Sequence, residues 1–287
     1  MENFFEIENL SCSYGERVVL KMEHLTIPKG EMVFIVGQSG CGKSTILEAL
    51  GLMNNTIVKN DKTVFNLCVG GEKIDVINVW NVENEILSNI RLKHFSFIFQ
   101  QTNLMRNFNI YENIAIARML QGADECDCMR ATSDILTTVG LESFFSMENG
   151  EWSANSKVFG NPGEASGGQQ QRMAFARAMV TDFDILFCDE PTGNLDPTTA
   201  DNLMCYLSKE IAKKKDVTSI IVSHDLPLSI KYGNRIIKIF IEKSEDGDYG
   251  LVNHKSVFEK DSNGFWRNEG KVFDNQSVEK ILKQSHA

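Results

Sequence analysis

The sequence predicts an α/β fold with a mostly parallel central sheet. Short apolar segments typical of buried strands alternate with helical segments, and a glycine-rich turn joins one such strand to a helix. A helical region at about residues 110–151 interrupts this alternation and is predicted to form a subdomain. The chain has 287 residues, of which 42% are hydrophobic and 24% are charged. This composition predicts a packed globular core, and the length suits one α/β domain with insertions.

The N-terminal part is predicted to begin with two half-buried strands, because apolar and polar residues alternate there. A short, continuously apolar strand follows, and then a glycine-rich turn and a helix. A stretch rich in β-branched residues and one further apolar segment predict more strands. The predicted strands span residues 7–14, 18–27, 31–36, 56–79 (as several strands) and 95–99, and the helix spans residues 43–53.

The remainder of the chain is predicted to alternate helices and strands and to end in a hairpin. The predicted helices span residues 111–120, 131–141, 167–180 and 196–215, and the strands span residues 184–188, 218–223, 235–241 and 250–253. The tail from about residue 255 is polar, with isolated apolar anchors at Phe258, Phe265, Trp266 and Phe273. We expect it to be a small element packed on the core, but it carries no motif that indicates a role.

A phosphate-binding loop is predicted between the third strand and the first helix, where the sequence matches G-x-x-x-x-G-K-[ST]. Its glycines let the backbone wrap tightly, so that successive N–H groups and the helix N-terminus face a phosphate. Lys43 is expected to reach the β- and γ-phosphates, and the Ser44 hydroxyl to bind Mg²⁺. The loop residues expected to bind the nucleotide are Gly37, Gln38, Ser39, Gly40, Cys41, Gly42, Lys43, Ser44 and Thr45.

A second apolar strand, at residues 184–188, leads into the acids Asp189 and Glu190. Ligands of open α/β sheets bind at the carboxyl ends of the strands, so these acids should lie beside the phosphate loop. We expect Asp189 to hold Mg²⁺ through water and Glu190 to polarise the attacking water as general base. Acids often simply end a strand, but the phosphate loop favours the functional interpretation.

A third motif, Ala165-Ser166-Gly167-Gly168-Gln169, resembles the LSGGQ signature of ATP-binding cassette (ABC) proteins, with alanine in place of leucine. The other motifs of that family follow in order over residues 6–253. Asn194-Leu195-Asp196 resembles the D-loop, and the residues that resemble single-residue motifs are Tyr14 (adenine stacking), Gln100 (Q-loop) and His224 (switch histidine). Gln101 is the alternative for the Q-loop role, and the position directly after a strand favours Gln100.

The resemblance implies an ABC-type P-loop NTPase, with an antiparallel β-subdomain and a helical subdomain at about residues 101–180. It implies a Mg²⁺-dependent ATPase at residues 4–253, followed by an extension at residues 254–287. Two cassettes, identical or different, would pair head to tail around ATP. Ser166 and Gly167 of one cassette would then contact the γ-phosphate held by the other, and the next signature residues, Gly168 and Gln169, are also expected to bind the nucleotide. His224 would support the attacking water, and Gln100 would sense both water and Mg²⁺.

The string Glu190-Pro191-Thr192-Gly193-Asn194-Leu195-Asp196 resembles the branch that includes lipoprotein-release, macrolide-exporter and cell-division cassettes. That resemblance implies a separate transmembrane permease as the partner, driven for transport or for force transmission. We expect the permease to dock at about residues 100–120, where residues 101–105 contain exposed-looking apolar side chains. Ordinary subdomain packing is the alternative explanation for those side chains.

Composition bears on the alternatives. The net charge of −10 disfavours non-specific binding to nucleic acid, so no nucleic-acid partner is expected. The sequence has no apolar run long enough to span a bilayer and no signal-peptide pattern, and its seven irregularly spaced cysteines indicate reduced thiols. We therefore expect a cytoplasmic protein, held peripherally at the membrane by its permease. The alternatives are a soluble ABC ATPase acting on nucleic acid or ribosomes, and a module that binds ATP without hydrolysing it.

Overall fold

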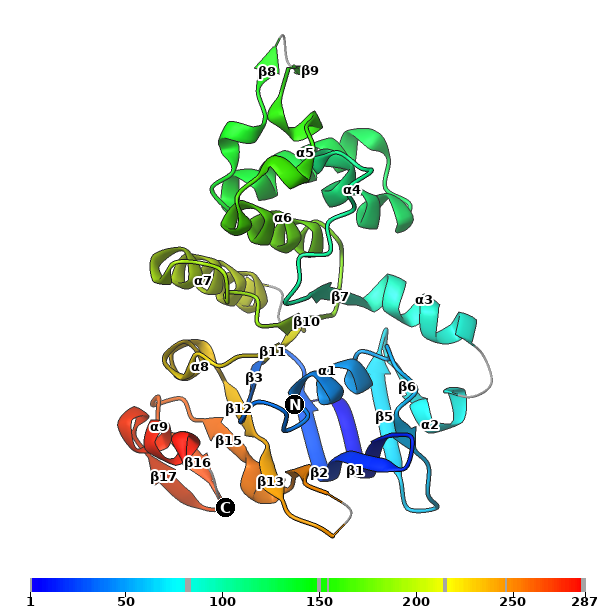
Figure 1. The fold of residues 1–287 in the computed structure, drawn as a ribbon, viewed down its shortest axis with the longest axis vertical. Helices are drawn as coiled ribbons and strands as arrows, with labels where there is room; N and C mark the ends of the chain where they lie inside the picture. The colour runs from blue at the N-terminus through cyan, green and yellow to red at the C-terminus, as the bar shows by residue number, and fades with distance from the viewer. Residues whose placement is uncertain are drawn as a thin grey trace.

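The computed structural model describes residues 2–80, 84–148, 151–153, 155–213, 216–245 and 247–284. Figure 1 shows helices α4, α5 and α6 gathered at one end of the molecule, with the β1–β2 hairpin and the C-terminal segment at the other. The parallel strands of the central sheet lie between these ends and carry the candidate site. Within the described ranges, no helix combines the length and the apolar character needed to cross a membrane.

The central sheet has a core of parallel strands, as the sequence predicts. Its strand order is β12-β3-β11-β10-β7, and each neighbouring pair is parallel. The paired residues of these strands are buried except Phe97 and Asp189, which are partly exposed, because helices or another sheet cover both faces. Burial on both faces explains why these strands are mostly apolar. The bounds are β3 Met32–Val36, β7 Phe95–Ile98, β10 Ile185–Asp189, β11 Thr218–Val222 and β12 Arg235–Lys238.

A second, mainly antiparallel sheet packs beside the first, and it includes the long N-terminal hairpin. Its order is β13-β14-β2-β1-β5-β6, with β4 paired to β1, and the only parallel contact among these described strands joins β14 to β2. The bounds are β1 Asn3–Tyr14, β2 Arg17–Pro28, β4 Ile57–Val58, β5 Val64–Val69, β6 Glu72–Asp75, β13 Phe240–Glu242 and β14 Tyr249–Val252.

Two hydrophobic cores form because successive side chains of the parallel strands point to opposite faces. From β3, Phe34 and Val36 join the core under the helices α4–α9, whereas Val33 and Ile35 join the core shared with α1 and the antiparallel sheet. The helices are α1 Lys43–Leu50, α2 Val76–Val79, α3 Asn84–His94, α4 Ile110–Leu120, α5 Glu125–Thr138, α6 Gly167–Met179, α7 Pro197–Lys213, α8 Leu226–Tyr232 and α9 Asn275–Lys283.

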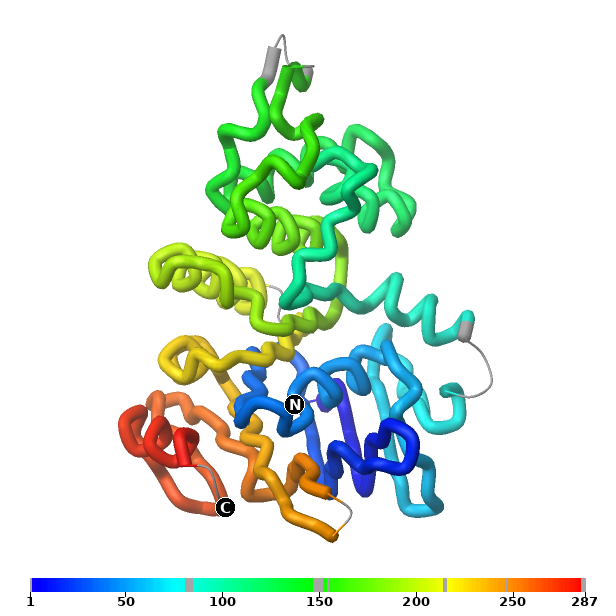
Figure 2. The backbone as a smooth tube through the Cα atoms, in the orientation of Figure 1, coloured from blue at the N-terminus to red at the C-terminus, as the bar shows by residue number. Residues whose placement is uncertain are grey.

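The tail continues the central sheet. Strands β15 (Val257–Lys260), β16 (Trp266–Asn268) and β17 (Lys271–Phe273) add antiparallel strands beyond β12, and helix α9 packs on them. The tube in Figure 2 shows this segment folding back against the strands around β12. Trp266 and Phe258 are fully buried as expected anchors, whereas Phe265 is 46% exposed. We call residues 257–284 the C-terminal extension.

Several sequence predictions need correction. Residues 76–79 form α2 and not a strand, because the Asp75 side chain caps the turn. The helix predicted for residues 43–53 ends at Leu50, and Leu52 is left-handed. The run 235–241 is divided between two sheets, so the hairpin joins only β13 and β14. The last two residues of the helix predicted for 196–215 lie outside the described residues.

Candidate functional site

The loop between β3 and α1 is held open as a cradle. Gly40 and Gly42 have φ values of 78° and 98°, which a residue with a side chain rarely adopts. The loop leads into the N-terminus of α1, so backbone N–H groups and the positive end of the helix dipole face the same space. Lys43 is almost fully buried, and its Nζ donates to the carbonyl oxygens of Gly37 (3.0 Å) and Gln38 (2.7 Å).

A cavity of about 470 Å³ lies over this loop. It brings together six residues that the sequence assigns to chemistry, from the loop, from the ends of β7 and β10, and from the segment after β11. Its lining consists of Val19, Ser39, Gly40, Gly42, Lys43, Ser44, Thr45, Gln100, Asp189, Glu190, Val222 and His224. The convergence follows from the parallel sheet, whose strands all end at this edge.

Asp189 ends β10 and accepts a hydrogen bond from the Ser44 hydroxyl at 3.2 Å. Burial raises the pKa of Asp189, and the nearby Glu190 and Glu48 add to the rise, while the hydrogen bond from Ser44 and the charge of Lys43 oppose it. Two of the three side chains that the sequence assigns to Mg²⁺, Ser44 and Asp189, are therefore adjacent.

Glu190 is the centre of a second group of side chains. Its Oε2 accepts a hydrogen bond from Gln100 at 3.1 Å, and its Oε1 lies 2.8 Å from Nε2 of His224. The backbone of Glu190 is left-handed, with φ of 47°, which costs a residue with a side chain on the order of 1–3 kcal/mol. Strain of this kind persists where the surroundings over-determine a conformation, and it is enriched at functional sites.

Four other residues predicted to contact the nucleotide do not line this cavity. Tyr14 is 53% exposed, and its hydroxyl lies 3.4 Å from Oε2 of Glu48 on α1. Cys41 is buried below the loop. Gly37 and Gln38 line a neighbouring cavity instead.

The signature residues are not brought to this cavity within one chain. Ser166 caps α6: its hydroxyl accepts from the backbone N–H of Gln169 at 3.3 Å, and the Gln169 side chain accepts from the backbone N–H of Ser166 at 2.9 Å. Gly167 and Gly168 form the first turn of α6. Ala165 packs against the core under the helices, so a small residue is accommodated there.

Four residues that the sequence did not single out support the site. Val19 lines the cavity, and Gly250 on β14 lies so close to the loop that an added Cβ would collide with the carbonyl oxygen of Cys41. Arg177 on α6 donates to the carbonyl oxygens of residues 102 and 103, just after Gln100. The buried Gln171 donates to the Pro191 carbonyl, just after Glu190. These supports depend on tertiary contacts, and none forms a local sequence pattern.

The chain is similar to known proteins over most of its length. A family model described as ABC transporter matches residues 20–193. The chain is 34% identical over 235 residues to the lipoprotein-releasing system ATP-binding protein LolD of Rickettsia prowazekii, covering 82% of this chain and 89% of that protein. It is 36% identical over 238 residues to the macrolide export ATP-binding/permease protein MacB of Campylobacter fetus, covering 82% of this chain and 33% of that longer protein.

Solved structures of ABC transporter cassettes also match the fold of this chain. A dimeric structure of the bacterial ABC transporter cassette MJ0796 matches with a TM-score of 0.65 and 28% identity, covering 82% of this chain and 93% of that one. A post-hydrolysis dimer of the same cassette, bound to ADP and Pi, matches with the same TM-score and 25% identity, covering 87% and 96%. Together with the phosphate loop and the acids beside it, these matches show that the chain belongs to the ABC transporter family and is an ATP-binding, ATP-hydrolysing subunit.

Proposed function

We propose that this chain works as one of two cassettes that close around ATP and drive a separate membrane permease. The observation that carries the proposal is the division of the predicted site. Glu190, Gln100 and His224 meet over the phosphate loop, whereas the signature turn that begins with Ser166 lies outside that cavity. A second cassette, another copy or a related chain, would supply the missing signature turn, and the likeness to a dimeric cassette supports this arrangement.

The phosphate loop, together with its Lys43, would bind the phosphates of ATP. With ATP bound, the Lys43 ammonium would turn from the loop carbonyls to the phosphate oxygens, which are stronger acceptors because they are charged. Tyr14 would stack on the adenine from its exposed position at the end of β1. Ser166 and Gly167 of the partner cassette would complete the γ-phosphate contacts with their N–H groups.

The donor set also fits Mg²⁺. Ser44, Asp189 and Gln100 offer hard oxygen ligands at one edge of the cavity, the type that Mg²⁺ prefers. Among the described residues, no cluster of three or more His, Cys, Asp or Glu side chains is arranged to hold a metal alone. This suits Mg²⁺, which takes few protein ligands and completes its shell with phosphate and water oxygens. When bound, it neutralises charge on the phosphates.

Hydrolysis would use the Glu190 group. Glu190 would accept a proton from the attacking water, and His224, within hydrogen-bond distance of Glu190, would hold that water and contact the γ-phosphate. Gln100 donates to the same carboxylate, so it holds Glu190 in place and links it to the segment that enters α4.

The permease would dock on the helical end of the cassette. A groove of about 710 Å³ lies there between residues 101–106 and residues 161–164, with Gln170 at its side. Leu104 offers apolar surface to the groove, while Arg106 and Glu164 provide charges of both signs. Met105 does not line the groove but is exposed next to it in the chain. Because Gln100 directly precedes this groove, movement of a docked segment would reach the Glu190 group. The relatives named for lipoprotein release and macrolide export support release or export as the output. With a permease docked here, the cassette would lie at the cytoplasmic face of a membrane and drive transport or force transmission.

Affinity capture from membranes tests the proposal. N-terminally tagged Glu190→Gln protein, purified with ATP present, should retain bound ATP in a cassette dimer and bring a transmembrane permease with it. Wild-type protein in ADP is the matched control and should release the dimer. Recovery of ribosomes or nucleic acid with no membrane protein would overturn the permease assignment and leave the ATPase assignment to be judged separately.

A further inference from the structure

The C-terminal extension is attached directly to the wall of the nucleotide site. Its strand β15 pairs with β12, and β12 pairs with β3, which runs into the phosphate loop. At the end of β12, Lys238 is 4% exposed, and its Nζ donates to the carbonyl oxygens of Ile281 (2.8 Å) and Gln284 (2.9 Å). A lysine of the ATPase core therefore holds the C-terminal end of α9.

A lysine of the extension makes the reciprocal contact. Nζ of Lys260, at the end of β15, donates to the carbonyl oxygens of Ile230 (2.6 Å) and Lys231 (3.2 Å) in the last turn of α8. It also lies 5.0 Å from the centre of the Trp266 ring. The cation sits where the negative end of the helix dipole favours it. Each lysine thus caps a helix that belongs to the other part of the molecule.

Helix α8 connects these contacts to the site. It begins at Leu226 with Asp225 as its cap, so His224 is the residue just before the cap. At the same end of the molecule, Leu282 of α9 is buried in the hydrophobic core that includes Ile230, and Leu226 packs against that core. Helix α8 is therefore held at one end by Lys260 and lies against α9, and its other end carries His224.

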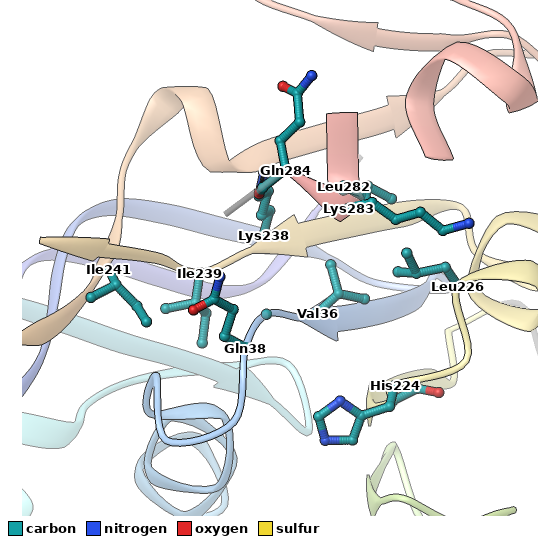
Figure 3. Close-up of a pocket in the computed structure, with 12 residues that line it drawn as sticks. Val36, Gln38, His224, Leu226, Lys238, Ile239, Ile241, Leu282, Lys283 and Gln284 are labelled. Carbon is teal, nitrogen blue, oxygen red and sulfur yellow. Dashed lines mark hydrogen bonds between the residues drawn. The ribbon is translucent and has the colours of Figure 1, made fainter. Parts of the chain in front are cut away.

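A small cavity of about 140 Å³ marks where the extension and the site meet. Figure 3 shows Leu282, Lys283 and Gln284 on one side of this cavity and Gln38 and His224 on the other. Lys238 lies between them. Residues of the extension and of the site line the same small cavity, so a shift of α9 would change the surroundings of both Gln38 and His224.

We propose that the C-terminal extension is a brace that fixes α8 and thereby holds His224 toward Glu190, with Lys260 as the positioning residue. The proposal rests on the role assigned to His224 under the proposed function. Lys260 touches neither the nucleotide cavity nor its lining residues, so it acts through α8 and not on the reacting atoms.

Simple covering of the sheet edge does not account for these contacts. An edge cap needs only the apolar anchors, such as Trp266, whereas burying an amine costs free energy unless hydrogen bonds replace its water. Among the described residues, Lys238 and Lys260 form no ion pair with a carboxylate, and both end on helix carbonyls. The last turn of α8 is also tied to α7 through Lys231 and Asp201, so loss of the brace should misplace α8 without unfolding it.

The test compares Lys260→Met, which keeps the length of the side chain, with Lys260→Arg, which restores two donors. The matched control is Lys271→Met, on an exposed strand of the same extension. ATPase rates are measured at a temperature at which circular dichroism shows all proteins folded. We expect kcat of Lys260→Met to fall at least about tenfold, because a misplacement of about 1 Å at the reacting centre can cost about 100-fold and Lys260 acts on His224 only through α8. The KM for ATP should stay within about twofold, since the phosphate loop is intact, and Lys260→Arg should recover most of the rate.

An unchanged kcat in folded Lys260→Met would overturn the proposal, as would a loss that Lys260→Arg does not repair. If Lys260→Met fails to fold, Lys238→Met, which releases α9 from the core side, replaces it with the same expected separation of kcat from KM. His224→Ala distinguishes this proposal from the proposed function. Full activity in His224→Ala would remove the role assigned to that histidine, whereas impaired His224→Ala with normal Lys260→Met would reject the brace alone.

Discussion

His224 and Glu190 lie 2.8 Å apart, although they come from the ends of different strands, β11 and β10. The two strands are parallel neighbours, so their carboxyl ends deliver both side chains to one side of the cavity. Gln100 donates to the other oxygen of the same carboxylate. A water bound beside this pair would therefore meet a proton acceptor whose orientation is fixed from two sides.

Replacing this acceptor should stop turnover and leave binding in place. We expect Glu190→Gln to lower kcat at least about 100-fold, the usual scale for general-base catalysis, because the amide cannot take a proton. Phosphate release measures the rate, and fluorescence titration with a nucleotide analogue measures affinity. Glu142→Gln, which removes an exposed carboxylate far from the cavity, is the control. A variant that keeps more than about a tenth of the wild-type rate would show that another group is the base.

Gly250 should be as important for ATP binding as a loop residue, even though it lies on β14. A Cβ at this position would collide with the carbonyl oxygen of Cys41 and would also press on Ile239 and Leu20. We expect Gly250→Ala to displace the phosphate loop and weaken ATP binding about tenfold or more, because the N–H groups of the loop must keep their geometry.

The control for that change is Gly264→Ala, at a turn where nothing lies near the added methyl group and only the left-handed backbone is strained. Isothermal titration with ATP should find wild-type affinity in Gly264→Ala. Equal ATP affinities in both variants would mean that the phosphate loop can move away from the added methyl group without weakening ATP binding.

Charge reversal in the groove should separate basal from coupled activity. Arg106→Glu and Glu164→Lys alter opposite walls of the groove and leave the cavity over the phosphate loop untouched. We expect basal ATPase activity to stay within about twofold, since exposed substitutions cost little stability, while capture of the permease is lost. Lys209→Glu, an exposed reversal on α7, should retain capture. Normal capture by both groove variants would remove this surface as the docking site.

The helical end of the molecule should lose stability in acid through Asp127. Hydrogen bonds from Arg118 and Arg130, each at 2.7 Å, hold the pKa of Asp127 below its usual range. A carboxylate with a lowered pKa in the folded state contributes stability above its unfolded value, about 3.9, and loses this contribution as the pH falls through the folded value.

Asp127→Asn should therefore melt below wild type at pH 7, and the two melting curves should converge as the pH falls below about 4. Asp182→Asn is the matched control, because Asp182 is 82% exposed and lies 4.0 Å from the same arginine. A melting difference for Asp127→Asn that is the same at pH 3 and pH 7 would contradict this assignment.

The parallel core could be predicted from the sequence because its strands are short, continuously apolar and punctuated by motifs. Elements whose conformation depends on tertiary contacts could not be predicted in this way. Three of residues 76–79 are β-branched and favour a strand on their own, but the Asp75 cap and the packing of Val76 make the segment helical. Helix α3, Asn84–His94, is not among the predicted elements, because most of its residues are polar and its buried side chains Leu87 and Ile90 make only a short apolar pattern.

Some residues of the candidate site could likewise be predicted from the sequence, and others could not. Lys43, Ser44, Asp189 and Glu190 could be found because the chemistry requires those residue types next to one strand or one turn. Gly250, Arg177 and Lys260 act from elsewhere in the chain through a close approach or a carbonyl contact. Contacts of that kind depend on where two distant segments meet, and a single sequence does not encode this as a pattern.

At Glu190, the side chain needed for hydrolysis stands on a left-handed backbone that lowers the stability of the folded protein. Asparagine tolerates this conformation far better than glutamate does, so Glu190→Asn should raise the free energy of unfolding by on the order of 1 kcal/mol in the same protein that it inactivates. The melting temperature should rise with it. Selection for thermal stability alone would therefore drift toward inactive variants here. Any effort to make this ATPase more heat-resistant has to screen for turnover at every round.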